Sequence, residues 1–315
     1  MKRGKVIIVG AGMVGTSIAY SIINQSICEE IVIIDINENK AIGEALDMMH
    51  ASEFMNYKTI VRSGNYSDCS DADIVIITAS VPMNSNLGSR MELLEKNKNV
   101  MKSIINSIMI SGFDGILLVV SNPVDVMTYY AYKLSGLPKE KVIGSGTTLD
   151  SARLHYYIAQ TVDVAPSSVY AFVIGEHGDS EMIAWSTATI GGKDAYNVFK
   201  DNKSRVGNAP YNYFLDKVKN AGWDVFTRKG NTSYGIAASV TGIIKSILYD
   251  ENKVYPVSVY LDGEYGVNDV YISVPTIISK KGAKEIVELH LTEDENKQFI
   301  NSCNILKEKC KEFIN

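Results

Sequence analysis

Short runs of aliphatic and β-branched residues alternate with longer helical patterns through the first half of the chain. The runs are apolar at successive positions, which is typical of strands buried on both faces in a parallel sheet. The segments between them have helical periodicity and are long enough to serve as crossover connections. This alternation predicts a doubly wound α/β fold. The expected strands are 5–9, 30–34, 59–61, 73–78 and 115–120, and the expected helices are 14–25, 42–55 and 91–111.

After about residue 147 the chain changes to shorter strand patterns joined by glycine-containing turns, with long helices among them. This mixture is typical of an α+β arrangement. We therefore expect a first domain at residues 1–147 and a second, α+β domain at residues 148–315, with no flexible linker between them. The expected strands of the second part are 169–174, 182–190, 254–261 and 269–275, and its expected helices are 151–159, 211–220 with its continuation, 233–249 and 292–313.

A glycine-rich turn follows the first expected strand and opens the first helix. Its sequence, Gly10-Ala11-Gly12-Met13-Val14-Gly15, fits the G-x-G-x-x-G pattern of dinucleotide-binding (Rossmann) folds, although such a motif alone is also compatible with a plain turn. The glycines allow a tight turn and a close backbone approach to a pyrophosphate, which the helix N-terminus favours. Asp35 ends the second strand, where a carboxylate suits a ribose 2′-hydroxyl and repels a 2′-phosphate. The sequence therefore predicts NAD rather than NADP as the cofactor.

One of the four histidines lies between two glycines at the end of an apolar run. This residue, His177, is placed to reach a substrate, whereas a buried core histidine is the alternative interpretation. Upstream, Asp150 and Arg153 are three residues apart and therefore lie on one face of a helix. Taken separately, Asp150 could be a helix N-cap and Arg153 a surface arginine. Their combination with His177 predicts a catalytic site.

A site of this kind suits the reduction of a 2-oxo acid by hydride transfer. Arg153 would bind the substrate carboxylate through two parallel hydrogen bonds, which lysine cannot reproduce. His177 would donate the proton, and Asp150 would orient the imidazole and stabilise its charged form. A second cation is needed where charge develops at the carbonyl oxygen. Arg90 is the candidate because it follows a polar loop at 81–89 suited to act as a lid, although a surface position at a helix start is the alternative.

The chain resembles the L-lactate/malate dehydrogenase family over essentially its whole length, and within it the bacterial L-lactate dehydrogenases. The matching segments are 10–15, 121–125, 142–144, 149–153, 174–180, 229–235 and 260–266. The resemblance implies that His177 is the proton donor, Asp150 its partner, Arg153 the carboxylate ligand and Arg90 the residue that polarises the carbonyl. It also implies that Asn122 and Thr232 contact the substrate. The residues expected to bind the cofactor are Gly10, Gly12, Met13, Val14, Gly15, Asp35, Thr78, Ala79 and Asn122.

The expected lid departs from the family pattern. Lactate dehydrogenases usually carry a glutamine near the substrate side chain and malate dehydrogenases an arginine, whereas the corresponding residue here is Met83 in a loop one residue longer. No arginine lies between Thr78 and Arg90, so a second substrate carboxylate would lack a cation and malate is disfavoured. A flexible methionine can also admit bulkier side chains. We therefore expect L-lactate dehydrogenase activity, with a 2-hydroxyisocaproate-type dehydrogenase as the alternative.

The resemblance also bears on assembly and regulation. Because family members are tetramers or dimers, a homotetramer is expected, with a dimer as the alternative. In many bacterial relatives an arginine and a histidine bind the activator fructose 1,6-bisphosphate, and the corresponding residues here are His155 and Tyr170. The loss of a guanidinium removes a main phosphate contact, so activation is expected to be weak or absent.

Composition argues against several other classes of protein. A net charge of −5 offers no basic surface for nucleic acid, and no apolar run is long enough to span a membrane. The four cysteines, Cys28, Cys69, Cys303 and Cys310, lack metal-ligand spacing, so neither a metal nor a disulfide framework is expected. We expect a cytoplasmic enzyme of glycolysis and fermentation. The competing interpretations are an inactive nucleotide-binding protein and an NAD-dependent enzyme resembling 6-phospho-α-glucosidases, which would need a metal site that four scattered histidines do not supply.

Overall fold

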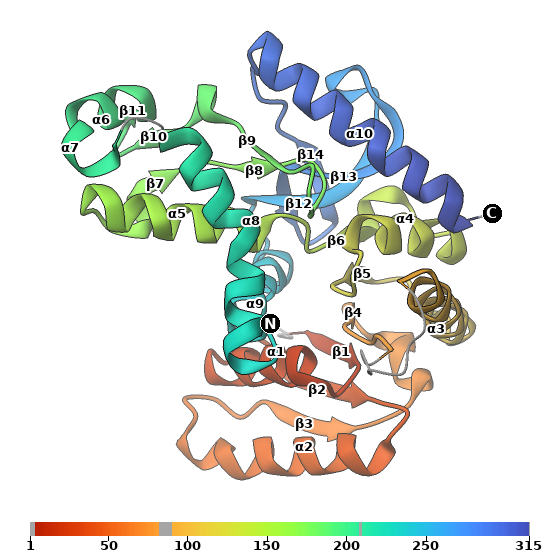
Figure 1. Cartoon of the computed structure of the whole chain (residues 1–315). Coiled ribbons are helices and arrows are strands. Elements are labelled where there is room, and N and C mark those ends of the chain that lie inside the picture. The colour runs from red at the N-terminus through yellow and green to blue at the C-terminus, as the bar shows by residue number, and fades with distance from the viewer. Residues whose placement is uncertain (1–3, 82–89, 208–209, 315) are drawn as a thin grey trace.

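Six parallel strands form one part of a sheet that runs through the molecule, with β3 at its edge (Figure 1). The computed structural model describes residues 4–81, 90–207 and 210–314. The strands lie in the order β3-β2-β1-β4-β5-β6, which is the doubly wound arrangement that the aliphatic runs predict. Their bounds are β1 (Lys5–Val9), β2 (Glu30–Ile34), β3 (Ile60–Ser63), β4 (Ile74–Ile77), β5 (Ile116–Val119) and β6 (Val142–Gly144).

Helices cover both faces of this sheet (Figure 1). Helix α1 (Met13–Asn24) packs against α9 (Tyr234–Tyr249) on one side, and α3 (Arg90–Ile110) packs against α4 (Val124–Ser135) on the other. Helix α2 (Glu38–Ala51) begins four residues before the expected start because the Asn37 side chain caps it, accepting a 3.1 Å hydrogen bond from the backbone N–H of Lys40.

The sheet continues beyond the parallel strands into the C-terminal half. Strands β12 (Lys253–Asp262) and β13 (Asn268–Ser279), both expected from the sequence, form an antiparallel hairpin. Strand β12 also pairs antiparallel with β6, where Ser258 faces Gly144, and this joins the hairpin to the parallel strands. With β14 (Gly282–Ile286) they complete a nine-stranded sheet. Residues on both sides of position 147 therefore share one sheet. The domain division at 147/148 stays a prediction.

Two expected strands are wrong because the chain changes pairing partners within them. Segment 169–174 divides into β7 (Val169–Tyr170), which pairs with β10 (Thr189–Ile190), and β8 (Val173–Ile174), which pairs with β9 (Met182–Ile183). Between these two strands, the Ala171 carbonyl oxygen lies 2.7 Å from His155 Nε2 and accepts a hydrogen bond from the ring. Segment 182–190 is interrupted by a 3₁₀ turn at Trp185–Thr187, because the Trp185 ring packs into a second hydrophobic core.

This second core lies under the helices of the C-terminal half. Trp185 contacts Phe199 and Phe214, whose rings come from α6 (Ala195–Asp201) and α8 (Pro210–Lys229). Helix α5 (Thr148–Val162) contributes Leu154 and Ile158 to the same core. The other strands and α-helices of the described residues are β11 (Lys193–Asp194), α7 (Lys203–Val206) and the long C-terminal helix α10 (Glu293–Ile314).

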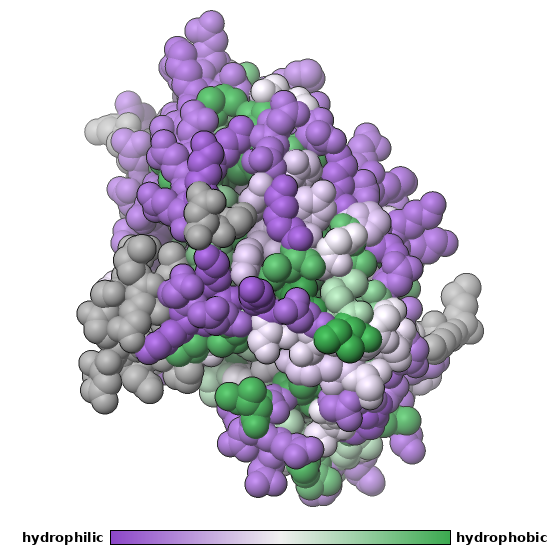
Figure 2. Space-filling view, turned by 90° about the vertical axis from the view of Figure 1, so that its right-hand side faces the viewer, coloured by the Kyte–Doolittle hydropathy of each residue, from purple (hydrophilic) through white to green (hydrophobic). Residues whose placement is uncertain are grey.

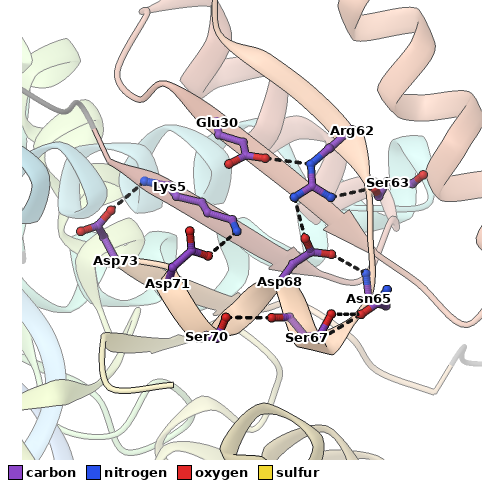
Figure 3. Close-up of polar contacts among 10 residues, drawn as sticks. All are labelled: Lys5, Glu30, Arg62, Ser63, Asn65, Ser67, Asp68, Ser70, Asp71 and Asp73. Carbon is purple, nitrogen blue, oxygen red and sulfur yellow. Dashed lines mark hydrogen bonds and ion pairs between the residues drawn. The ribbon is translucent and has the colours of Figure 1, made fainter. Parts of the chain in front are cut away.

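A polar network ties the outer strands together at the edge opposite β14 (Figure 3). Arg62 on β3 donates to Glu30 on β2 at 2.7 Å and to Asp68 at 2.6 Å. Lys5 on β1, which is buried, forms an ion pair with Asp71. These contacts hold the 3₁₀ segment Tyr66–Asp71 against the strands β1 and β3, so we assign them a structural role.

The face seen in Figure 2 is mainly hydrophilic, and its hydrophobic side chains form separate small groups. Among the described residues, no helix is both long and apolar enough to cross a bilayer. All four cysteines are free and buried, in agreement with the expectation that they form no disulfide framework.

Candidate active site

A cavity of about 470 Å³ opens beside the carboxyl ends of β5 and β6. This is where ligands bind in open α/β sheets, because the loops that follow the strands converge there. The loops supply Asn122, Ser145 and Gly146, and α5, α8 and α9 complete the wall. The structure brings six predicted residues to this cavity: Val14, Asn122, Asp150, Arg153, His177 and Thr232.

Asp150 connects the other two predicted catalytic side chains. Helix α5 begins at Thr148 with Thr147 as its N-cap, so the interpretation of Asp150 as the N-cap is wrong. The Asp150 side chain is only 2 % exposed. Its Oδ1 lies 2.8 Å from Arg153 Nη1, and its Oδ2 lies 2.6 Å from His177 Nδ1. One buried carboxylate thus orients both an arginine and a histidine toward the same cavity.

The charges of this cluster shift its proton affinities in opposite directions. Burial alone would lower the pKa of His177, but the charge and hydrogen bond of Asp150 outweigh burial and raise this pKa to about 9. For Asp150, burial would raise the pKa, yet the neighbouring His177 and Arg153 hold it below its usual value. The imidazolium is therefore stable at neutral pH, as a proton donor requires.

The loop that carries His177, residues 175–181, is anchored from three elements. Gly175, with φ of 97°, pairs with Ser273 on β13. The backbone N–H of His177 donates a 2.8 Å hydrogen bond to Asp125 on α4. Glu176, which is buried, forms an ion pair with Lys309 on α10 and accepts a 2.6 Å hydrogen bond from Ser180. The imidazole thus projects from a fixed backbone and keeps 29 % of its side chain exposed toward the cavity, so the core-histidine interpretation does not hold.

The glycine-rich turn has the shape that a dinucleotide requires. Gly10 has φ of 112°, and a Cβ at Gly15 would lie 2.0 Å from the Gly10 carbonyl oxygen. Both positions therefore need glycine for the close packing of α1 on the turn. At Gly12 a Cβ would meet no atom within 4 Å. Gly12 also precedes the N-terminus of α1, whose first turn contains no acidic side chain, so the open space and the free N–H groups fit a pyrophosphate.

Asp35 and Thr78 support this turn from neighbouring strands. Asp35 accepts hydrogen bonds from the backbone N–H groups of Ala11, at 2.7 Å, and Asn37, at 2.8 Å. The Thr78 hydroxyl donates to the carbonyl oxygens of Val9 and Gly10, so it shapes the turn. The expected cofactor contacts of the glycines, Asp35 and Thr78 stay predictions, as do those of Met13, Val14, Ala79 and Asn122.

Two predicted residues have no described side chain. Met83 lies outside the described residues. Arg90 begins α3, but its side chain lies outside the described part of the chain. Their roles as lid and carbonyl-polarising residues stay predictions.

Comparison with known proteins supports the same conclusions. Family models of the lactate/malate dehydrogenases match the chain twice, the NAD-binding domain at residues 4–144 and the alpha/beta C-terminal domain at residues 147–315. The chain belongs to the lactate/malate dehydrogenase family. The expected family, the Rossmann fold and NAD as cofactor are thereby confirmed.

Individual members of the family are similar over their full length. L-lactate dehydrogenase 3 of Bacillus cereus is 47 % identical over 313 residues, which cover 99 % of both chains. The minor L-lactate dehydrogenase of Enterococcus mundtii in its ligands-bound form is 43 % identical, with a TM-score of 0.95 and 99 % of both chains covered. The lactate dehydrogenase MGS-M5 from a deep-sea metagenome library is 42 % identical, with a TM-score of 0.96 and full coverage of both chains.

The structure adds residues that sequence reasoning missed. Glu181 lies on the cavity wall, directly after the segment that matches the family around His177. Its place at the start of a short apolar run is the one sequence feature that could have indicated it. Trp223 and Phe226, stacked on each other along α8, add an aromatic wall. Asp125 stands in a segment quoted for the family resemblance, but nothing in the sequence indicated that it would hold the His177 backbone.

Proposed function

We propose that this protein is an NAD-dependent L-lactate dehydrogenase that interconverts pyruvate and L-lactate in the cytoplasm. The supporting observation is the buried Asp150 carboxylate, which orients Arg153 and His177 toward one cavity beside the dinucleotide turn. Full-length similarity to proteins named L-lactate dehydrogenase points the same way. In this proposal residues 1–147 bind NAD and residues 148–315 bind the substrate.

The side chains divide the work by their chemistry. Arg153 binds the substrate carboxylate and so fixes the orientation of the 2-oxo acid. His177 donates a proton to the carbonyl oxygen as it becomes a hydroxyl, and Asp150 stabilises the imidazolium until that transfer. Arg90 polarises the carbonyl, and Asn122 and Thr232 line the substrate site. Bound NADH supplies the hydride, and bound NAD⁺ accepts it in the reverse direction.

The direct test compares kcat/KM for NADH oxidation with pyruvate, oxaloacetate and 2-oxo-4-methylpentanoate. We expect pyruvate to lead the other two by tenfold or more, which corresponds to about 1.4 kcal/mol of transition-state discrimination. The absence of pyruvate reduction by a folded, NADH-binding protein would overturn the proposal.

A 2-hydroxyisocaproate-type dehydrogenase is the second candidate. One observation favours this function, namely the aromatic part of the cavity wall. Trp223 and Phe226 offer apolar surface that an extended side chain could contact. A flexible methionine at position 83, in the expected lid, is also compatible with a bulkier substrate side chain. If the branched acid leads in the comparison, replacing Met83 by Gln should move the preference toward pyruvate. An unchanged profile in that variant would show that Met83 does not set the preference.

We further propose a homotetramer with weak or absent activation by fructose 1,6-bisphosphate. Burial lowers the pKa of His155, and its ring already contacts the Ala171 carbonyl, so it is a poor phosphate ligand at neutral pH. Sedimentation velocity gives the oligomeric state directly. A large fall in the pyruvate KM on adding the sugar bisphosphate would contradict the regulatory part of the proposal.

A further inference from the structure

A buried carboxyl group in the cavity has no role in the reaction described above. Glu181 directly precedes β9, its residue is 5 % exposed, and it lines the cavity. Its backbone N–H donates to the Gly178 carbonyl at 3.2 Å, which fixes the turn. Among the described residues, no hydrogen bond or ion pair engages its carboxyl group. Buried carboxylates are normally paired, so this one needs a physical account.

The charged groups around Glu181 come from three elements. A carboxylate oxygen of Glu181, an oxygen of Asp150 and a ring nitrogen of His177 all lie within 4.8 Å of one another. Arg153 on α5 and Lys219 on α8 are the cations that face it. Arg153 is engaged by Asp150, and the Lys219 ammonium donates to the Asp179 carbonyl at 2.7 Å. Asp125, which accepts a hydrogen bond from the His177 backbone, is a further acidic group near the His177 ring.

The cluster of Asp150, His177 and Glu181 could be interpreted as a metal site, but the contacts of Asp150 disfavour this interpretation. Both Asp150 oxygens are occupied, one by Arg153 and the other by His177. A metal would have to displace one of these partners. A proton on Glu181 requires no such displacement, because a neutral, buried carboxyl group carries no unpaired charge.

The electrostatics of the cavity agree with this account. Burial, followed by the negative charge of Asp150, raises the pKa of Glu181 to about 8, although His177, Lys219 and Arg153 act in the opposite direction. A 2-oxo acid brings one more negative charge into the same cavity. Its binding therefore favours the neutral form of Glu181 further.

We propose that Glu181 is a second proton-binding group of the active site, and that the substrate anion binds productively only when Glu181 is protonated. The proposal rests on the proposed function, because it takes this cavity as the site of the 2-oxo acid. The Glu181 proton is separate from the one that His177 transfers, and it stays on the carboxyl group throughout the reaction. Glu181 thus acts on substrate binding through its charge.

The requirement for two protons has a specific kinetic signature. If both Glu181 and His177 must be protonated, log(kcat/KM) for pyruvate reduction falls at alkaline pH with a slope approaching −2. In Glu181→Gln, which cannot ionise, the slope becomes −1. Ionisation of Glu181 affects mainly KM, because only the fraction of the enzyme in which Glu181 is protonated binds substrate productively. Between pH 7 and pH 9 we expect the wild-type KM to rise about tenfold more than that of the variant.

The experiment measures kcat and KM from pH 6 to pH 10 for the wild type, Glu181→Gln, Glu181→Asp and Asp216→Asn. Glu181→Asp retains a carboxyl group and should keep the steeper slope. Asp216→Asn makes the same charge change on the exposed face of α8 and should leave the profile unchanged. At pH 6, below the pKa of about 8, the difference in KM between the wild type and Glu181→Gln should be smallest, because Glu181 is then protonated in the wild type.

The outcomes separate this proposal from the proposed function. A wild-type slope of −1, or a slope of −2 that persists in Glu181→Gln, would overturn the role of Glu181 while leaving the dehydrogenase intact. Failure of the wild type to reduce pyruvate at every pH would instead overturn the proposed function. If Glu181→Gln does not fold, as judged by circular dichroism, the wild-type slope decides the question, together with Glu181→Asp.

Discussion

The Nδ1 atom of His177 lies 2.6 Å from the Oδ2 atom of Asp150, which is buried. Because an ionised carboxylate can only accept, the ring donates this bond and presents its other nitrogen to the cavity. The same carboxylate holds Arg153 through its second oxygen. A single side chain thus determines where His177 and Arg153, the proposed proton donor and the proposed substrate ligand, lie relative to each other.

Replacing Asp150 by Asn should therefore affect both the position of the proton donor and its charge. Without the negative charge the pKa of His177 falls, so the alkaline limit of pyruvate reduction moves to lower pH. We expect kcat/KM at pH 7 to decrease by at least about 10²-fold. The pH profile of the reduction, measured with NADH binding as a control for folding, checks this. An unchanged alkaline limit would contradict the assigned role.

The two reaction directions should prefer opposite pH ranges. Reduction needs protonated His177 and is supported below its pKa of about 9, whereas oxidation of L-lactate needs the neutral ring and is favoured above it. Initial rates in both directions between pH 6 and pH 10 provide the test. Coincident profiles would argue against His177 as the group that carries the proton.

Replacing Arg153 by Lys preserves the positive charge but removes the planar fork that binds a carboxylate with two bonds. We expect the pyruvate KM to rise strongly and kcat/KM to fall by about 10²-fold, because a charge-assisted hydrogen bond is worth about 1.5–3 kcal/mol. Steady-state kinetics measure the effect. A KM within a factor of two of the wild type would show that Arg153 does not bind the substrate.

Replacing Asp35 by Ser should weaken the preference for NADH over NADPH. The carboxylate that repels a 2′-phosphate is then absent, and the Ala11 N–H loses its 2.7 Å acceptor. We expect the ratio of kcat/KM for NADH to that for NADPH to fall by at least about tenfold. If the ratio is unchanged, another residue excludes the phosphate.

Replacing Lys309 by Met should destabilise the protein and weaken the anchoring of the loop at residues 175–181, which carries His177. The change leaves Glu176 buried with only the Ser180 hydroxyl and the loop backbone near its carboxylate, so we expect a loss of about 1–3 kcal/mol in the free energy of unfolding at pH 7.

The effect should also depend on pH. The pKa of Glu176 is held below its usual value, so its ion pair stabilises the fold above that range and loses this contribution as the pH falls through the lowered pKa. Urea unfolding at pH 7 and pH 4 measures both values, and Lys311→Met, exposed on the same helix, is the matched control. An equal loss at both pH values would contradict the ion-pair interpretation.

Most of the parallel sheet could be predicted because its strands are uninterrupted aliphatic runs. Ile74–Ile77 and Ile116–Val119 are buried throughout, and composition alone indicates this. Helix α4 was missed because nearly every residue of its first two turns is buried, so it shows no amphipathic period. The apolar run 169–174 predicts a single strand, because the sequence does not reveal that the pairing partner changes at Ala171.

The candidate site divides in the same way. The sequence predicts that Asp150, Arg153 and His177 act together because their residue types and spacing suit one reaction, and the structure places them at one cavity. Glu181, Asp125 and Lys309 could not, because their roles depend on contacts between segments far apart in the chain: Lys309 lies 133 positions from its partner Glu176. Such contacts leave no local pattern in the sequence.

The anchoring of the catalytic loop by α10 has a consequence for biosynthesis. The loop at 175–181 depends on Ser302 and Lys309, which a ribosome adds more than 100 residues after His177. The parallel strands and the glycine-rich turn, by contrast, are complete once β6 has emerged. A nascent chain can therefore assemble its nucleotide-binding half well before it can hold His177 in place, so the ordered arrangement around His177 is among the last features that this polypeptide acquires.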